Sequence, residues 1–253
     1  CMGRISRELV QVMPDNRTVL MGDDATNSGL FMFVADKEKD LSSGSLYIAK
    51  FGAGFSIDPA AAAAPLSWIK LGSATSAEIE QLANTLKATD IMMLSATDPA
   101  LAIPADTSYT KITANGKVEW VKLKPGMEKA AAFLETHRYA AYVGGSLGFT
   151  KMEGTTVNIK DKVAYSAISA ISSSLIAGNS ANKEAPLGGG SLVNSLAGFA
   201  TNSAGMVVQH KLGDNQTDSD GNPINSDWVP YQSSMLINGA LMAADAMGNT
   251  NVV

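Results

Sequence analysis

Short apolar runs separated by turns rich in glycine and aspartate recur along this chain, and they constrain its fold more than any other feature. The first four runs lie at positions 18–22, 29–34, 45–51 and 68–71. Runs of this length that are rich in β-branched and aromatic residues are typical of antiparallel strands. The sequence therefore predicts a four-stranded meander at the start of the chain.

The middle of the chain, residues 75–145, has a different pattern. Ser76 resembles a helix N-cap, and the apolar residues after it recur on one helical face. Pro125 opens a second helical pattern that ends at a glycine pair, and between the two helices residues 117–123 alternate as in a strand. We interpret this block as a helical insertion that decorates a β scaffold, with a loop over residues 90–110.

Strand patterns return after residue 150, at positions 162–168, 205–212, 228–231 and 235–237. Sets of strands separated by turns predict a propeller, a sandwich or a barrel within a single domain that spans residues 1–253. At about 40–50 residues per blade, the chain would supply only three or four blades of a propeller. A closed ring would need more polypeptide.

Composition excludes several classes of protein. The chain has 19 basic and 24 acidic residues, a formal net charge of −5, and its pI is about 5.0. A duplex nucleic-acid binder would need a dense basic face, so we expect no nucleic-acid partner. Apolar residues make up 45% of the chain, which is enough for a core. No apolar run reaches the roughly 18 residues of a membrane-spanning helix.

The ends of the sequence favour an internal portion of a longer polypeptide. The chain starts at Cys1 without a signal peptide, and its last residues contain no terminating feature. A mature lipoprotein also starts with cysteine, but a flexible polar tether usually follows, and here a strand-like pattern follows at once. The single cysteine allows no disulfide within the chain.

Several common catalytic motifs are absent from the sequence. It has no Gly-x-Ser-x-Gly elbow, and residues 52–54 lack the third glycine of a dinucleotide loop. The glycines at 188–190 are followed by serine without the lysine of a P-loop. His137 and His210 lie far apart in the sequence, and we interpret both as structural.

The carboxylates are better candidates for chemistry. Asp23 and Asp24 end a predicted strand, and paired acids need a neutralising cation, so they indicate either a hard-metal site or a solvated turn. Lys151 and Glu153 would share one face of an extended segment. That pair suits a site for a metal and an anion, or it is an ordinary cross-strand charge pair.

Two further acidic segments have plainer interpretations. Glu8 follows two arginines, which is compatible with a surface ion pair. Residues 218–222 match part of a calcium loop, but position 216 is glutamine and position 227 is aspartate, and no predicted helices flank the segment. A solvated hairpin tip is the favoured interpretation there.

Five segments, read in order, resemble motifs of the PhoX-type alkaline phosphatase family. Residues 44–51, Gly-Ser-Leu-Tyr-Ile-Ala-Lys-Phe, are similar to its G-x-L-Y-V-A-K-F stretch, the most specific of the five. The other segments are residues 2–8 (G-R-[FY]-S-H-E), 18–24 (V-Y-x-T-x-D-D), 136–154 (a helix leading into R-x-E-G) and 227–239 (F-x-W-x-P-F-L-I-x-G). The five matches occur in the family's order and together span most of the chain.

This resemblance implies a mainly β fold, part of a six-bladed β-propeller with helical insertions. It further implies an axial site that holds calcium and iron and hydrolyses small-molecule phosphate monoesters, in a protein exported to the periplasm or the exterior. Glu8 and Glu153 match metal-ligand glutamates of the family, and Asp23 and Asp24 match acids near the metals. Lys151 matches the position of an arginine that grips phosphate, so Lys151 and Glu153 are the expected catalytic residues, with Arg7 as a second substrate contact.

The sequence departs from the family pattern at two of these positions. Arg7 stands where the family usually has histidine, and Lys151 keeps the charge of the usual arginine but lacks its bidentate fork. These departures favour an alternative, a non-catalytic propeller that binds a ligand or a protein partner. A third interpretation is a calcium-dependent, lactonase-like hydrolase.

Overall fold

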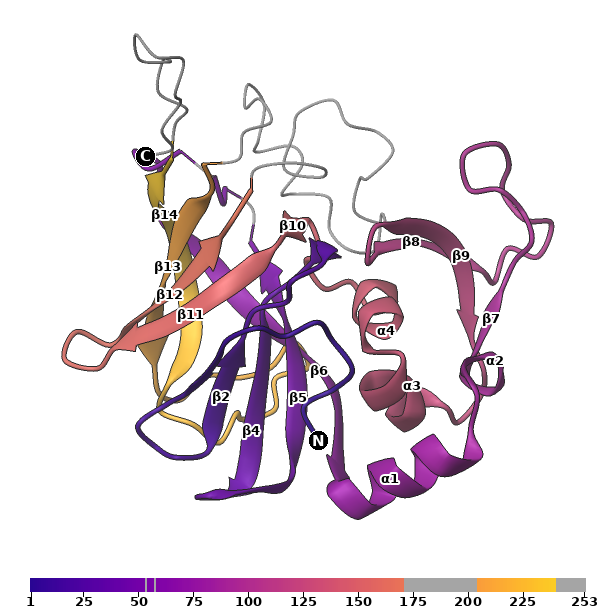
Figure 1. Cartoon of the computed structure of the whole chain (residues 1–253), viewed down its shortest axis with the longest axis horizontal. Coiled ribbons are helices and arrows are strands. Elements are labelled where there is room, and N and C mark those ends of the chain that lie inside the picture. The colour runs from indigo at the N-terminus through magenta and orange to yellow at the C-terminus, as the bar shows by residue number, and fades with distance from the viewer. Residues whose placement is uncertain (53, 57, 171–203, 240–253) are drawn as a thin grey trace, which may run out of the picture.

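The computed structural model describes residues 1–52, 54–56, 58–170 and 204–239 and shows a mainly β protein, as predicted (Figure 1). The strands in these ranges are β1 (Val10–Val12), β2 (Thr18–Met21), β3 (Thr26–Ser28), β4 (Phe31–Lys37), β5 (Asp40–Phe51), β6 (Ala64–Thr75), β7 (Met92–Leu94), β8 (Thr110–Ala114), β9 (Lys117–Leu123), β10 (Phe149–Thr150), β11 (Met152–Asn158), β12 (Val163–Ile168), β13 (Met206–Gly213) and β14 (Val229–Asn238). The helices are α1 (Ser76–Thr85), α2 (Ala88–Ile91), α3 (Glu128–Leu134) and α4 (Thr136–Tyr142).

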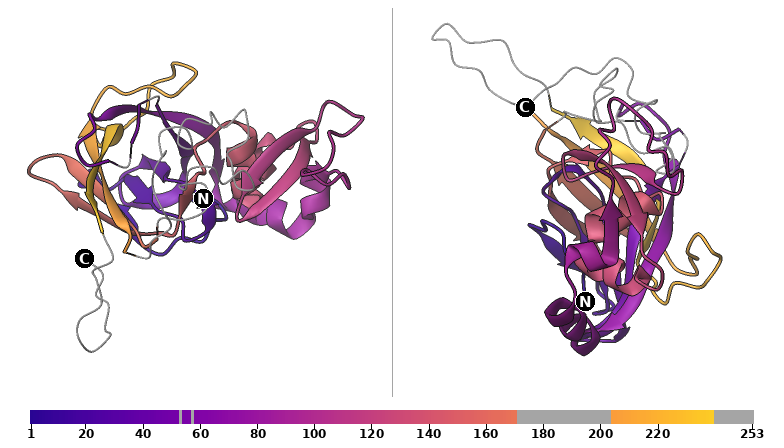
Figure 2. Two further views of the ribbon diagram at one scale, coloured as in Figure 1. Left: turned by 90° about the horizontal axis from the view of Figure 1, so that it is seen from above. Right: turned by 90° about the vertical axis from the view of Figure 1, so that its right-hand side faces the viewer.

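One continuous antiparallel sheet of nine strands organises the described part of the chain. Its order is β1-β2-β4-β5-β6-β14-β13-β12-β11. The sheet curls until its two edge strands, β1 and β11, lie against each other (Figure 2). The four runs at the start of the sequence became β2, β4, β5 and β6 and pair in that order, which confirms the predicted meander. A continuous sheet of this kind differs from the separate blades of a propeller.

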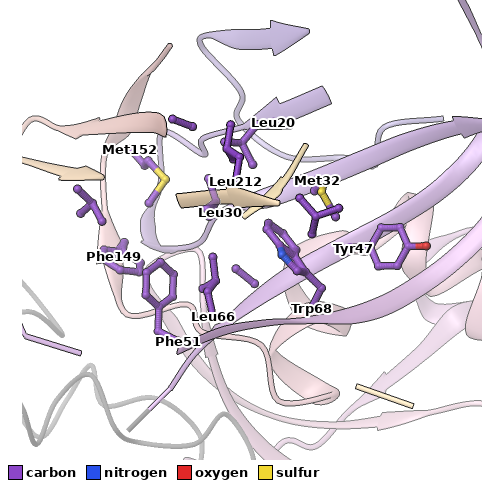
Figure 3. Close-up of a cluster of buried hydrophobic side chains, with 14 of the residues drawn as sticks. Leu20, Leu30, Met32, Tyr47, Phe51, Leu66, Trp68, Phe149, Met152 and Leu212 are labelled. Atoms are coloured by element: carbon purple, nitrogen blue, oxygen red, sulfur yellow. The ribbon is translucent and has the colours of Figure 1, made fainter. Parts of the chain in front are cut away.

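The inside of the curled sheet holds the first of two cores. Leu20, Met32, Phe51 and Trp68 point into it, and Phe149 joins them from β10 (Figure 3). Because successive side chains of a strand face opposite sides, the alternate residues of the same strands point outward. Those outward residues are also buried, so that every residue of β2 is covered on both faces.

The segment between β6 and β10 covers the outer face of the sheet and forms the second core. It contains all four helices and a separate three-stranded sheet of order β7-β9-β8 (Figure 1). Helix α3 packs on β6, where Ala132 and Phe133 lie next to Gly72 of that strand. The prediction of a second continuous helix was wrong in detail, because the chain leaves helical geometry at Glu135 (φ −121°, ψ 43°) and divides it into α3 and α4.

Other differences from the predicted elements are local. The predicted loop 90–110 begins with the end of α2 and with β7. The two predicted runs near the end of the described chain form the single strand β14, whose pairing with β13 is interrupted by bulges. Residues 218–222 lie in the loop between β13 and β14, as expected for a hairpin tip. There Asp218 accepts hydrogen bonds from the main-chain N–H groups of Asp220 and Asn222 at 3.0 and 2.9 Å.

None of the helices in the described ranges has the length and apolar character that crossing a bilayer would require.

Candidate functional site

Three of the charged residues singled out from the sequence meet at one end of the curled sheet. Lys151 Nζ donates to Asp24 Oδ1 at 2.8 Å and to Glu153 Oε1 at 2.6 Å. We call Asp24, Lys151 and Glu153 the lysine cluster. Asp24 follows β2, Lys151 separates β10 from β11, and Glu153 belongs to β11. The structure therefore brings together residues 127 positions apart.

Main-chain hydrogen bonds hold the two segments of this cluster together. Lys151 N donates to Ala25 O at 3.1 Å, and Met152 N donates to Asp23 O at 3.2 Å. Lys151 has a φ of 57°, in the left-handed region, so it is not part of the extended segment that the sequence suggested. Its ammonium nevertheless reaches Glu153, two residues further along the chain.

The lysine cluster is exposed to solvent, and its oppositely charged groups shift each other's pKa. The hydrogen bonds that Lys151 donates to Asp24 and Glu153 raise the pKa of Lys151, and the one to Asp24 lowers the pKa of that carboxyl. The Lys151 side chain is 47% exposed, so water screens these interactions and their contribution to stability is small. The charged atoms are accessible to a ligand from solution.

Asp23 faces the opposite way from its neighbour Asp24 and is completely buried. Its Oδ1 accepts from the main-chain N–H of Ser6 at 2.8 Å, and its Oδ2 lies 2.5 Å from Nε2 of His137 in α4. Both carboxylate oxygens are thus engaged within the protein. Asp23 therefore orients the imidazole of His137 and connects the N-terminal segment to α4.

Arg7 and Glu8 lie on the N-terminal segment that approaches this end of the sheet. Asp24 N donates to Ser6 O at 2.7 Å, which places the segment beside the lysine cluster. The Arg7 guanidinium donates to the main-chain carbonyls of Met2 and Gly3, and burial lowers its pKa, partly offset by Asp23. Glu8 is exposed, and within the described ranges it makes no ion pair.

A polar pocket of about 330 Å³ opens on the other side of Asp23. Its wall includes Arg4 and Ser6 of the N-terminal segment, Lys117 at the start of β9, and His137 and Arg138 of α4. Arg138 is neutralised within the wall. It donates to both oxygens of Glu119 at 2.8 and 3.2 Å and to Glu135 at 2.5 Å, and these bonds raise its pKa. We call this space the His137 pocket.

The carboxylates of Asp23, Asp24 and Glu153 supply only part of the ligands that a metal ion needs. Calcium takes six to eight oxygen ligands. In the described parts of the chain no three histidine, cysteine, aspartate or glutamate residues are grouped as a metal site would need. Asp24 and Glu153 offer two carboxylates around one cation, Lys151, whereas Asp23 is occupied by His137. The oxygen-only pair suits a hard cation and is an incomplete shell for one.

The pairing of His137 with Asp23 is a contact that the sequence does not predict, because the two residues lie 114 positions apart. The contact holds the N-terminal segment to α4 and is compatible with the structural interpretation of His137. His210 agrees with that interpretation, because it is fully buried between the hydroxyls of Ser233 and Ser166 at 2.7 and 3.0 Å. No spacing in the sequence distinguishes the two histidines.

Comparisons with known proteins give a family and one solved structure. Residues 1–225 match the family described as "Alkaline phosphatase PhoX". The solved structure, Pseudomonas fluorescens PhoX in complex with vanadate, a transition state analogue, has 16% sequence identity and a TM-score of 0.48. The alignment covers 92% of this chain and 31% of that chain, so this chain spans about a third of that protein's length. No curated protein matches.

Proposed function

The chain belongs to the PhoX family of alkaline phosphatases, and from this membership we propose that it contributes to the hydrolysis of phosphate monoesters at the lysine cluster. The observation that carries the proposal is the position of Lys151, whose ammonium lies between the carboxylates of Asp24 and Glu153. An exposed ammonium is a suitable partner for phosphoryl oxygens. The carboxylates beside it are suitable partners for a cation.

In this proposal Lys151 binds the phosphoryl group of the substrate. A phosphate monoester carries two negative charges, and Lys151 would exchange part of its contact with Asp24 and Glu153 for contact with phosphoryl oxygens. The released carboxylates would then be free to hold a cation. Arg7 lies on the neighbouring segment and is proposed as a second substrate contact once its guanidinium leaves the carbonyls of Met2 and Gly3.

We propose calcium as the cation that Asp24 and Glu153 would hold, with Glu8 and Asp23 as further expected ligands. Hard oxygen ligands favour calcium, and when bound it would neutralise phosphoryl charge and lower the pKa of a bound water. Glu8 is exposed on the adjoining segment, whereas Asp23 would first have to leave His137. Iron rests on the family resemblance alone.

The six-bladed propeller and the export of the protein to the periplasm or the exterior are likewise proposals that rest on family membership. Nine of the described strands form one continuous curled sheet. A propeller would require the strands to be divided into blades around a channel.

The test is hydrolysis of p-nitrophenyl phosphate, with calcium and iron supplied and then removed by chelation. We expect Lys151→Gln to lose about 100-fold in activity, the cost of removing one charged donor from a transition state, and Lys151→Arg to keep most of the activity. Lys160→Gln, at an exposed turn between β11 and β12, is the matched control. Full activity of Lys151→Gln, or activity unaffected by chelation, would contradict the proposal.

The second candidate function is phosphate-ester binding without hydrolysis. It is favoured by the absence of a three-residue metal group from the described ranges. Tight binding of phosphate that depends on Lys151, with no release of p-nitrophenol at any metal concentration, would support it over the enzyme.

A further inference from the structure

The His137 pocket has the size and the walls of a binding site for a small molecule. Its volume of about 330 Å³ is at the lower end of the range of ligand pockets, roughly 300–1,000 Å³. Three separate parts of the chain build it: the N-terminal segment, the turn between β8 and β9, and the start of α4. Most of the side chains that line it are polar or charged.

Two cations in the wall have no acidic partner among the described residues. Arg138 is not one of them, because it is fully used by Glu119 and Glu135. Arg4 and Lys117 also line the pocket and are exposed, and neither forms an ion pair within the described part of the protein. Two such cations in the wall of one pocket suit a negatively charged ligand group.

His137 adds a hydrogen-bonding ring nitrogen to the same wall. Its Nε2 is taken by Asp23, and Nδ1 has no hydrogen-bond partner among the residues that the structure describes. A carboxylate is an acceptor only, so Nε2 donates to Asp23, and Nδ1 is the ring nitrogen that can contact a ligand. Because Asp23 is completely buried and also held by Ser6, the imidazole is fixed in this orientation.

We infer that the His137 pocket binds a small hydroxylated organic anion, whose acid group is received by Arg4 and Lys117 and whose hydroxyl forms a hydrogen bond with Nδ1 of His137. This site is separate from the lysine cluster, and its existence does not depend on hydrolysis there. It lies on the other side of the Asp23–Asp24 dipeptide. The ligand is defined by its chemistry: one phosphonate, phosphate or carboxylate group and one hydroxyl, within about ten non-hydrogen atoms.

The probes for a test are 2-hydroxyethylphosphonate and ethylphosphonate, which differ by one hydroxyl and contain a C–P bond that ester hydrolysis does not cleave. Calorimetric titration of the wild-type protein should show tighter binding of the hydroxylated probe, by about five- to tenfold. The double variant Arg4→Gln/Lys117→Gln should weaken the binding of both probes at least tenfold. Both positions are exposed, so the double variant should fold, and its circular dichroism and thermal midpoint check this.

Nitrogen-15 NMR supplies a readout that a general electrostatic effect would not move. The chain has only two histidines, and His210 is buried far from solvent, so it serves as an internal reference. Addition of 2-hydroxyethylphosphonate should shift the Nδ1 resonance of His137, and ethylphosphonate should not.

A variant of the lysine cluster distinguishes this inference from the proposed function. Lys151→Gln removes any binding of the probes at the lysine cluster and should leave unchanged both the preference for the hydroxylated probe and its dependence on Arg4 and Lys117. If Lys151→Gln abolishes binding while Arg4→Gln/Lys117→Gln does not, the probes bind at the lysine cluster, and the inference is overturned while the proposed function stands. Equal affinity for the two probes, or no binding to the wild type, also overturns it. Loss of phosphatase activity has no bearing on any of these outcomes.

Discussion

His210 illustrates how one buried side chain makes the stability of this protein depend on pH. It spans three strands, accepting or donating to Ser166 in β12 and Ser233 in β14, and burial lowers its pKa to about 3. The ordinary value of a histidine is about 6.5. As pH falls below that value, the unfolded chain binds the proton first, and the free energy of unfolding decreases until the pH approaches the folded pKa.

We therefore expect His210→Gln to flatten the acid side of the stability curve. Between about pH 6 and pH 4, the wild type should lose stability by up to about 1.4 kcal/mol per pH unit more than the variant does. Urea unfolding at a series of pH values measures this difference. Identical slopes for the two proteins would show that His210 is protonated equally in the folded and unfolded states.

A second prediction concerns Asp23, whose carboxylate fixes the tautomer of His137. In Asp23→Asn the amide oxygen can still accept from Ser6 N, and the amide NH₂ then faces Nε2 of His137. Nε2 must become an acceptor, and the proton moves to Nδ1. We expect a loss of about 1–3 kcal/mol in the free energy of unfolding, as for a weakened buried hydrogen bond.

Nitrogen-15 NMR of His137 in Asp23→Asn checks this tautomer directly. A protonated Nδ1 is the expected result. If Nε2 keeps its proton in the variant, Asp23 does not set the tautomer. His210 again provides the reference signal in the same spectrum.

At the scale of the elements, Gly22 controls how closely the end of β2 approaches β11. A Cβ at this position would lie 2.3 Å from the main-chain oxygen of Met152. Gly22→Ala must therefore push the two segments apart, and it should cost about 1–3 kcal/mol in the free energy of unfolding. The displacement separates Asp24 from Lys151, so we expect activity to fall together with stability.

Gly213→Ala is the matched control for this prediction. The nearest atoms to a Cβ there belong to the half-exposed ring of Tyr231 at 3.1 Å, which can move aside. Urea denaturation and the p-nitrophenyl phosphate assay on both variants form the test. Equal effects of the two substitutions would rule out a special role for the contact between Gly22 and Met152.

The elements that sequence patterns predicted are those with a strong local signal. β2, β4, β5, β6, β9, β12 and β13 follow from short apolar runs or from apolar alternation, and α1 follows from its apolar face. The predicted N-cap of α1, Ser76, was wrong by one residue, because Thr75 caps the helix and forms a capping box with Glu78. The two- and three-residue strands β1, β3 and β10 were missed, because so few residues carry no periodicity and their pairing depends on distant partners. The break at Glu135 was missed because the apolar pattern continues across it.

Some residues of the candidate sites could likewise be predicted from the sequence, and others could not. Asp24, Lys151 and Glu153 could be selected from the sequence because charged residues next to apolar runs are conspicuous, and their meeting depends on β2 and β11 coming together. His137 could not be selected, because only the packing of α4 against the N-terminal segment brings it to Asp23. Arg4 and Lys117 could not be selected either, because they become candidates only through a pocket that no local sequence pattern predicts.

At the scale of the whole molecule, a narrow seam joins the two halves of the large sheet. β6 and β14 pair through only two positions, Pro65 with Gln232 and Ala64 with Ser233. The buried indole of Trp68 supplements them by donating to Pro230 O at 2.6 Å. Strands β1, β2, β4, β5 and β6 lie on one side and β11–β14 on the other. The two sides are thus held together by few hydrogen bonds and by the shared core.

Trp68→Phe tests the strength of this seam. It keeps an aromatic ring in the core but leaves the carbonyl of Pro230 without its donor, so we expect a loss of about 1–3 kcal/mol in the free energy of unfolding. Trp120→Phe is the control, since the Trp120 indole N–H has no partner in the described structure. Denaturation followed by circular dichroism compares them, and a larger effect at Trp120 would contradict the role given to Trp68.

The adjacent carboxylates at the end of β2 point in opposite directions, one toward α4 and the other toward Lys151. One peptide bond therefore connects a buried contact with α4 to a solvent-exposed contact with Lys151. The exposed carboxylate is accordingly positioned from the interior of the protein, through a histidine that lies 114 residues away from Asp23 in the sequence.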